Sequence, residues 1–232
     1  MTPALLLLPG WACNDAVWTA LLRALGTPPD RFEHTPWAET ETAARRPRPG
    51  GPRIALAHSL GALAALSAAL EQPARFDALI LLAATARLPA DTGYPGADPR
   101  ACQAMRVRLR RDPSGLMRDF TALACAPAPA RPELFALPTE QTRPQFAAGL
   151  ARLQETDLRA ACRSAPLPPT LLIHGAQDAV VPLASAAALE AALSGRARLA
   201  VLPDAGHMLP ATHPQPVAEL ILAFLSGLGH VC

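Results

Sequence analysis

Short apolar runs, separated by longer stretches that favour helix, limit the fold of this sequence more than any other feature. Gly, Pro or polar residues bound each run, as expected of strands buried on both faces of a sheet. We expect such strands at Ala4–Leu8, Arg53–Ala57, Leu79–Ala84, Thr170–His174 and Arg198–Leu202. The Ala- and Leu-rich stretches between them suit helices. This alternation predicts an α/β fold with a mostly parallel sheet flanked by helices.

Two segments interrupt the alternation. Residues 36–52 are polar and rich in Pro and Gly, which predicts a surface loop with one short helix. Residues 86–165 contain no strand-like run but have helical stretches near Pro99–Arg111, Ser114–Ala124 and Arg143–Ala161. A helical insertion between buried strands indicates a lid over an active site. We therefore expect a core made of residues 1–85 and 166–232, with residues 86–165 as the lid.

Length and charge bear on the domain count and on the class of protein. With 232 residues, half of them hydrophobic, the chain is long enough for one domain with an insertion. Its 21 basic and 19 acidic residues give a formal charge of +2, which argues against nucleic-acid binding. Every basic residue is Arg. Because Ala and Pro are abundant too, the codon bias of a GC-rich genome explains this, and only the placement of the arginines is informative.

The cysteines and the apolar runs bear on compartment and cofactors. The five cysteines form no Cys-x-x-Cys pair and no metal-finger spacing, as expected of free thiols in a reducing cytosol. No signal peptide and no apolar stretch of ~20 residues is visible. The sequence shows no dinucleotide or phosphate loop. We expect a cytoplasmic protein that uses no membrane, metal ion or cofactor.

A candidate nucleophile stands between a predicted strand and a predicted helix. The sequence Ala-His-Ser-Leu-Gly at Ala57–Gly61 has the context of a nucleophile elbow, with Ser59 as the exposed hydroxyl. Gly61 lets the helix start close to the strand, and the helix N-terminus favours an oxyanion. Ala57 replaces the usual first Gly with the smallest side chain. An ordinary strand–helix turn with an N-capping Ser is the alternative interpretation.

Two further residues follow strands in the order that a Ser-His-Asp triad of this type requires. Asp178 comes after the strand Thr170–His174, and His207 comes after the strand Arg198–Leu202. Because the carboxyl ends of parallel strands meet at one edge of the sheet, both side chains are expected beside Ser59. Asp178 would then orient His207, which would take the Ser59 proton.

Other candidates fit less well. Asp204 lies only three residues before His207 and is expected to shape the turn. The side chain of His58 should leave the elbow in another direction, and His174 is expected to be packed and hydrogen-bonded. The remaining histidines have no strand-end context, so surface or capping roles are expected of His34, His213 and His230.

An oxyanion hole needs two backbone N–H groups. Leu60, directly after the nucleophile, would supply one. The second should come from the loop after the first strand, where Trp11 is the candidate and Gly10 makes room. The Trp11 side chain can be a core aromatic at the same time, because the donor is main-chain.

The stretch Leu5–Trp18, the elbow, the turn Gly175–Asp178 and the pair Gly206-His207 resemble the α/β-hydrolase superfamily. Within it, the chain most resembles the pimeloyl-[acyl-carrier protein] methyl ester esterases of biotin synthesis. The region Leu79–Pro99, the Arg-bearing helix after it and Thr156–Arg159 carry this closer likeness.

The resemblance implies a reaction. A serine esterase would hydrolyse the methyl ester of a pimeloyl chain bound to acyl-carrier protein, through an acyl-enzyme on Ser59. It also implies a methyltransferase acting upstream on the same substrate. The sequence departs from the family at Pro9, where His is common, and at Ala57 and Ala62, where Gly is common. The leading strands usual in the superfamily are expected to be missing or minimal.

Arginines concentrate in one stretch of the predicted lid. Arg106 and Arg110 share a helix face, so their like charges repel each other. An acidic partner would relieve this repulsion. The acidic helices of an acyl-carrier protein would suit such a patch, although a solvated face is the alternative. The candidate docking residues are Arg106, Arg108, Arg110, Arg111 and Arg118.

The triad alone does not fix the substrate, since it serves esters and thioesters alike. A general short-chain carboxylesterase or a thioesterase is therefore an alternative function. A non-catalytic binding protein of the same fold is a further alternative, although such a protein has no need of an aligned Ser-His-Asp set.

Overall fold

A computed structural model describes residues 4–26, 28–47 and 52–229. His230 and Cys232 lie outside the described residues. The described strands form one parallel sheet in the order β2-β1-β3-β4-β5-β6. Their bounds are β1 (Ala4–Leu8), β2 (Phe32–His34), β3 (Arg53–His58), β4 (Ala78–Leu82), β5 (Thr170–Gly175) and β6 (Ala197–Leu202). The predicted fold class, a mostly parallel sheet flanked by helices, is confirmed.

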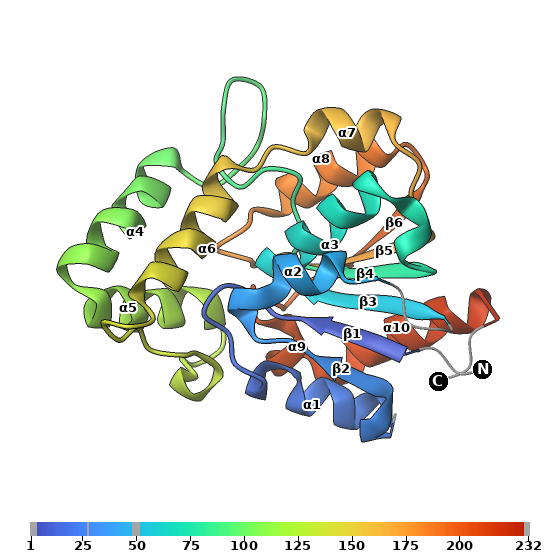
Figure 1. Ribbon diagram of the computed structural model, residues 1–232, viewed down its shortest axis with the longest axis horizontal. Coiled ribbons are helices and arrows are strands. Elements are labelled where there is room, and N and C mark those ends of the chain that lie inside the picture. Colours follow the sequence, from blue (N-terminus) through green and yellow to red (C-terminus); the bar gives the residue numbers. More distant parts are fainter. Residues whose placement is uncertain (1–3, 27, 48–51, 230–232) are drawn as a thin grey trace.

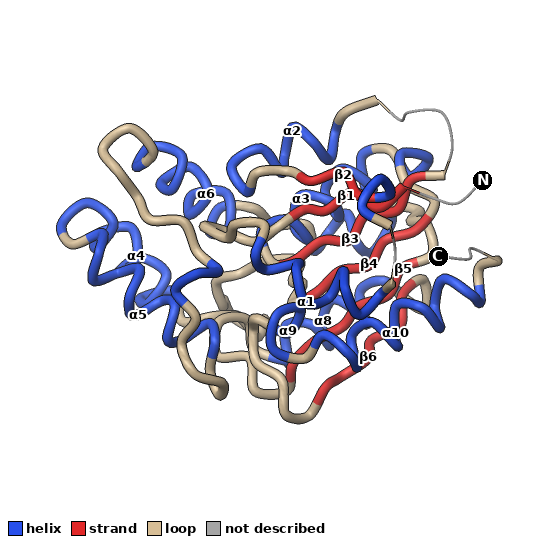
Figure 2. Tube along the Cα trace, turned by 90° about the horizontal axis from the view of Figure 1, so that it is seen from below, coloured by secondary structure: helices blue, strands red, loops and turns tan. Residues whose placement is uncertain are grey.

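Helices cover both faces of this sheet. One layer contains α1 (Ala16–Leu25), α9 (Leu209–Thr212) and α10 (Pro214–Gly227), which lie in front of the strands in Figure 2. The other layer contains α2 (Thr40–Arg45), α3 (Leu60–Glu71), α7 (Arg159–Ser164) and α8 (Leu183–Leu193), as Figure 1 shows. Both layers pack closely, since every residue of the central strands β3, β4 and β5 is buried and most of these residues are apolar, as expected of parallel strands covered on both sides.

Strand periodicity divides the core into two halves. Leu5 and Leu7 of β1 belong to the cluster that contains α1 and α10, whereas Leu6 and Leu8 belong to the cluster that contains α3 and α8. Successive side chains of a strand point to opposite faces, so a single Leu run supplies both halves.

The structure corrects three details of the sequence prediction. The strand β2 is missing from the prediction, because its three residues are only half-buried or exposed. The strand β6 lies at an edge of the sheet and is half-buried or exposed rather than covered on both faces. The predicted helix at Arg143–Ala161 is two helices, α6 (Arg143–Glu155) and α7, separated by residues 156–158.

The segment 86–165 contains three longer helices beside the sheet rather than on it. They are α4 (Pro99–Arg111), α5 (Pro113–Cys125) and α6, and they lie together beyond one end of the sheet in Figure 1. Asp112 caps α5, since its carboxylate accepts a hydrogen bond from the Gly115 N–H at 2.9 Å. Pro113 is the first helical residue, where its missing N–H costs nothing. The strong cap explains why α4 and α5 separate at this point.

Candidate active site

The turn that holds Ser59 has a strained backbone. Ser59 lies between β3 and α3 with φ 53° and ψ −113°, a conformation that non-glycine residues rarely adopt. Its N–H donates to the Leu82 carbonyl at 2.9 Å, which ties the turn to β4. A Cβ on Gly61 would stand 2.0 Å from the Leu8 carbonyl oxygen, so only glycine lets α3 begin this close to the sheet.

His207 lies in hydrogen-bond contact with both partners that the sequence indicates. Its Nε2 is 3.1 Å from the Ser59 Oγ, and its Nδ1 donates to the Asp178 Oδ2 at 2.8 Å. The Asp178 loop and the His207 loop pack directly on each other, because a Cβ on Gly175 would stand 2.3 Å from the Ala205 carbonyl oxygen. The structure thus brings the three predicted side chains together, although they are distant in the sequence.

Backbone amides hold the Asp178 carboxylate in place. Its Oδ1 accepts from the N–H groups of Val180 and Val181, each at 2.8 Å, so Oδ2 is left for His207. Burial raises the pKa of Asp178, but the charge and hydrogen bond of His207, the charge of His174 and the backbone donor together hold it below its ordinary value. The carboxyl group therefore stays ionised and accepts a hydrogen bond from the Nδ1–H of His207.

Two buried histidines support these loops. The His58 Nε2–H donates to the His207 carbonyl at 2.9 Å, and the His174 Nε2–H donates to the Val181 carbonyl at 2.9 Å. Burial and the nearby His207 charge lower the pKa of His58 to about 3. Neutral His58 therefore anchors the backbone of His207 without adding a charge beside it. The sequence reasoning missed this contact, because only the spatial path of the His207 loop reveals it.

The proposed oxyanion donors flank the Ser59 turn. Leu60 is the first residue of α3, and the N–H of a first helical residue has no acceptor within its own helix. Gly10 approaches the elbow closely, since a Cβ there would stand 2.8 Å from the His58 Nδ1. Trp11 follows Gly10 with a buried side chain whose Nε1–H donates to the Phe146 carbonyl at 2.9 Å. The side chain thus packs as a core aromatic, and Trp11 and Ser59 line the same small cavity.

An aromatic cluster joins the loop after β1 to the helices of segment 86–165. The Trp11 ring meets those of Phe120 and Phe146 edge to face, with centroids 5.0 and 5.6 Å apart. Phe120 and Phe135 also line the small cavity that contains Ser59 and His207. Side chains of segment 86–165 therefore form part of the wall of the cavity at Ser59.

Intramolecular ion pairs engage three of the five docking candidates. Arg106 contacts Glu155 at 3.0 Å, while Arg108 and Arg118 share Asp119 at 2.8 and 3.2 Å. Packing of α4 against α6 supplies Glu155, so an acidic partner for Arg106 is present within the protein itself.

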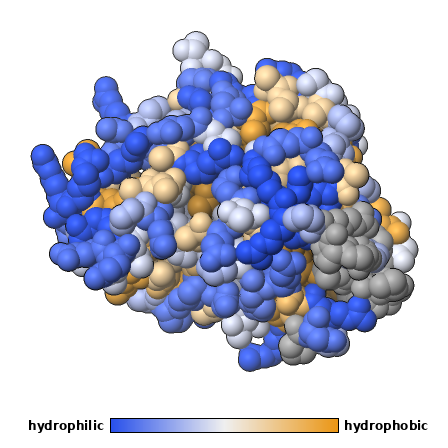
Figure 3. Space-filling model, in the orientation of Figure 1, coloured by the Kyte–Doolittle hydropathy of each residue, from blue (hydrophilic) through white to orange (hydrophobic). Residues whose placement is uncertain are grey.

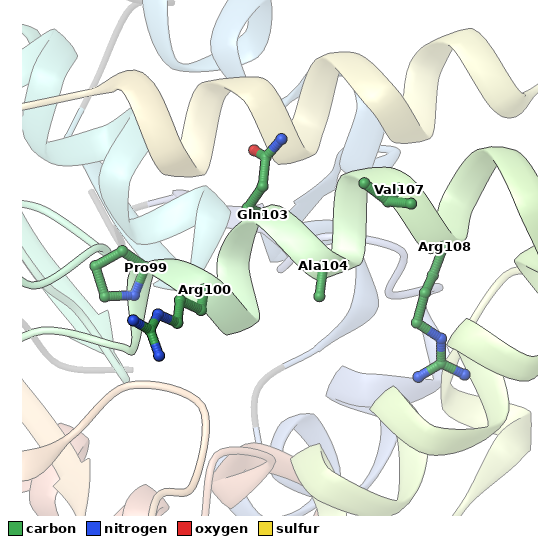
Figure 4. A pocket seen from close by; sticks show the side chains of 6 residues that line it. All are labelled: Pro99, Arg100, Gln103, Ala104, Val107 and Arg108. Carbon is green, nitrogen blue, oxygen red and sulfur yellow. The ribbon is translucent and has the colours of Figure 1, made fainter.

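The remaining candidates, Arg110 and Arg111, are exposed, and within the described ranges no acidic side chain pairs with either. Hydrophilic side chains project from this end of the molecule in Figure 3. Figure 4 shows the outer side of α4, with Arg108 turned toward the neighbouring helix and Val107 and Ala104 between the arginines.

The other sequence candidates lie elsewhere. His34 ends β2, contrary to the expectation that it has no strand-end context, and its ring lies 3.6 Å from the Asp15 carboxylate. His213 stands at the start of α10, where its Nδ1 contacts the Thr212 hydroxyl at 2.9 Å. Within the described ranges, no group of three or more His, Cys, Asp or Glu side chains is arranged to hold a metal ion. No described helix is long and apolar enough to cross a membrane.

Solved structures share the fold. An esterase from Exiguobacterium antarcticum superposes with a TM-score of 0.77 at 18% identity, covering 97% of this chain and 92% of that one. An esterase from Thermogutta terrifontis gives a TM-score of 0.74 at 21% identity, covering 100% of this chain and 91% of that one.

Sequence relatives are closer. The family model described as serine aminopeptidase, S33, matches residues 38–212. A protein from Aeromonas hydrophila named pimeloyl-[acyl-carrier protein] methyl ester esterase is 32% identical, with 96% of this chain and 95% of that protein covered. A protein of the same name from Aromatoleum aromaticum is 33% identical, with 97% and 99% covered. This chain therefore belongs to the serine aminopeptidase S33 family of α/β-hydrolases, together with the pimeloyl-[acyl-carrier protein] methyl ester esterases.

Proposed function

We propose that this protein is a serine carboxylesterase that hydrolyses the methyl ester of pimeloyl-acyl-carrier protein in biotin synthesis. The hydrogen-bonded series from Ser59 through His207 to Asp178 is the observation that carries the proposal. The names and near-complete coverage of the relatives support the substrate. A methyltransferase that forms the ester would act upstream of this protein.

In the first half of the reaction, the Ser59 Oγ attacks the ester carbonyl carbon and its proton passes to the His207 Nε2. The backbone N–H groups of Trp11 and Leu60 stabilise the oxyanion of the tetrahedral intermediate. The intermediate collapses with departure of methanol, which takes its proton from His207. An acyl-enzyme on Ser59 remains.

In the second half, a water molecule gives a proton to His207 and attacks the acyl carbonyl. Collapse of this intermediate returns the proton to the Ser59 Oγ and releases the free carboxylic acid of the chain. The Asp178 carboxylate keeps the Nδ1–H tautomer of His207 throughout, and it stabilises the imidazolium that forms twice in the cycle. The helices of segment 86–165 act as a lid that excludes bulk water.

Two experiments test the assignment. A fluorophosphonate probe is expected to label the wild-type protein and to fail with Ser59→Ala. Labelling that survives the substitution would identify another nucleophile. No labelling of a folded wild-type protein would favour a binding protein. Hydrolysis of pimeloyl-acyl-carrier-protein methyl ester is then compared with simple methyl esters and with thioesters of equal length. A clear preference for simple esters or for thioesters would support one of the alternative activities.

We also propose that arginines of α4 and α5 dock the acidic carrier protein on the lid. Such a surface should mainly raise the association rate, and salt should weaken it. The residues proposed are Arg106, Arg108, Arg110, Arg111 and Arg118. Reversal of Arg106 would place two carboxylates against each other at Glu155, so Arg110 and Arg111 give the cleaner test.

The docking test is a double charge reversal, Arg110→Glu with Arg111→Glu. It is expected to lower kcat/KM on the carrier-protein ester about ten-fold or more at low salt while sparing p-nitrophenyl acetate. The matched control reverses Arg23 in α1 and Arg198 in β6, both exposed and outside the lid segment. Equal losses in both double variants would show an effect of net charge alone and would refute docking at α4.

A further inference from the structure

The ring of His58, directly before the nucleophile, has a nitrogen that the fold does not use. His58 is 0% exposed, and its Nε2 lies 2.9 Å from the His207 carbonyl oxygen. Because a carbonyl can only accept, Nε2 carries the proton, and because burial lowers the pKa of His58 to about 3, the ring is neutral. Nδ1 is therefore a bare acceptor, and no donor among the described residues bonds to it. A buried acceptor without a donor is rare enough to require an explanation.

This nitrogen lies at the small cavity beside the nucleophile. His58, Ser59 and His207 all line the cavity, which has a volume of about 10 Å³. Gly10 lines it too, and a Cβ there would stand 2.8 Å from the His58 Nδ1 and 3.2 Å from the Ser59 Cβ. The space that glycine leaves unfilled thus touches both the unused nitrogen and the nucleophilic residue.

The cavity suits one water molecule. Its volume is close to the smallest that holds a water, and a buried water needs about two to four polar partners. The His58 Nδ1, the Ser59 Oγ and the His207 Nε2 offer that number, whereas Phe120 and Phe135 make the opposite wall apolar. Since Ser59 is only half-buried, an ester does not have to enter through this space.

The second half of the reaction needs a water whose two protons have different fates. One proton passes to the His207 Nε2, and the other stays on the attacking oxygen. An acceptor for the second proton fixes the direction in which the water presents its lone pair. The His58 ring lies beside the base, with ring centroids 4.9 Å apart. With a pKa of about 3, His58 is too weak a base to compete with His207 for the first proton.

We propose that His58 is a positioning residue for hydrolysis of the acyl-enzyme, because its Nδ1 accepts a hydrogen bond from the attacking water in the small cavity. The proposal rests on the acyl-enzyme at Ser59. As the water oxygen bonds to the acyl carbon, one proton goes to the His207 Nε2 and the other remains on the oxygen, hydrogen-bonded to Nδ1. Cleavage of the bond between the carbon and the Ser59 Oγ then returns the proton from His207 to Ser59 and releases the acid.

Competition between water and methanol separates this role from the anchoring of His207. Methanol can attack the same acyl-enzyme, but its only O–H proton goes to His207 and leaves none for Nδ1. Since both nucleophiles use the same base, a disturbed His207 slows both alike. The ratio of methyl acetate to acetate formed from p-nitrophenyl acetate at a fixed methanol concentration therefore reports the Nδ1 contact alone.

Three variants give the test. His58→Leu removes the acceptor and should raise the methyl acetate-to-acetate ratio about two- to ten-fold, the effect of one hydrogen bond. His58→Gln keeps a donor and an acceptor and should stay nearer the wild-type ratio. The matched control is His174→Leu, because His174 is also buried and anchors the Val181 carbonyl at 2.9 Å, but it does not line the cavity. This control should leave the ratio unchanged.

An unchanged ratio in His58→Leu would overturn the proposal, as would an equal rise in His174→Leu. Nitrogen-15 NMR of the wild-type protein adds a check that needs no substitution: His58 should carry its proton on Nε2 alone. A proton on Nδ1 would leave no acceptor and would also overturn the proposal. Turnover that survives Ser59→Ala, with no acetyl group on residue 59 of the wild-type protein, would instead reject the nucleophile on which the proposal rests.

Discussion

The substitution Asp178→Asn gives the sharpest test of how the three side chains cooperate. In the wild-type protein the N–H groups of Val180 and Val181 both donate to the Asp178 Oδ1. An N–H group can only donate, so the amide oxygen of Asn must take the Oδ1 place and the NH₂ group must take the Oδ2 place. The NH₂ group then donates to the His207 Nδ1, which has to accept.

This exchange puts the His207 proton on the wrong nitrogen. With Nδ1 accepting, the proton sits on Nε2 and points at the Ser59 Oγ, 3.1 Å away. His207 then has no lone pair there to take the Ser59 proton. The corresponding Asp-to-Asn change in a serine protease lowers kcat about 10⁴-fold, and we expect a loss of that order here, about 5 kcal/mol in the activation barrier.

The assay is kcat on p-nitrophenyl acetate at neutral pH, with the thermal midpoint as a check of folding. Nitrogen-15 NMR of the imidazole reports the tautomer directly and should show a protonated Nε2 in the variant. Asp178→Ala is the control, because it leaves His207 free to adopt either tautomer. A folded Asn variant that lost less than about ten-fold in kcat would refute the tautomer argument.

Three further outcomes follow from the packing and charges. Gly61→Ala should lower the free energy of unfolding by about 1–3 kcal/mol or more in a urea titration, because the added Cβ would stand 2.0 Å from a β1 carbonyl oxygen. The control Gly227→Ala should be tolerated, because no atom lies within 4 Å of its added Cβ. Acid should destabilise the protein from about pH 6.5 toward pH 3, because burial lowers the pKa of His58 to about 3 while the unfolded chain takes up a proton. His58→Gln should reduce that slope of stability against pH by about 1.4 kcal/mol per pH unit, and an unchanged slope would contradict the burial argument. Arg152→Ala should cost at most about 1 kcal/mol in salt-dependent stability, since its 2.7 Å ion pair with Glu41 links half-exposed side chains of α6 and α2.

The sheet and the meeting point of Ser59, Asp178 and His207 could be predicted because they depend on local patterns. Buried parallel strands require continuous apolar runs, and the carboxyl ends of such strands share one edge of the sheet. The strand β2 escaped detection because its three residues have neither an apolar run nor an alternating pattern. The break between α6 and α7 was missed because no Pro or Gly marks residues 156–158.

Features that depend on how helices pack could not be predicted in this way. Arg106 looked unpartnered along its own helix, but its partner Glu155 comes from α6, some fifty residues later in the chain. The contact from His58 to the His207 carbonyl likewise depends on the path of a distant loop. Sequence patterns report which face of an element is apolar, whereas tertiary packing decides which charges and carbonyls lie opposite it.

The same distinction separates the chemistry of this site from its selectivity. A nucleophile, a base and an orienting acid serve any acyl group, so the residues at the sheet edge cannot favour one chain over another. Selectivity must come from the side chains that the acyl chain touches, and around Ser59 these include Phe120 and Phe135 of segment 86–165 as well as Trp11 and Met208 of the core. Phe120 lies where the two sets of residues meet, because its ring packs edge to face on that of Trp11 and also lines the cavity that contains Ser59. Substitutions at this position should therefore change the preference among acyl chains more than the rate on the shortest ester, because Phe120 supplies an apolar surface and no group that donates or accepts a proton.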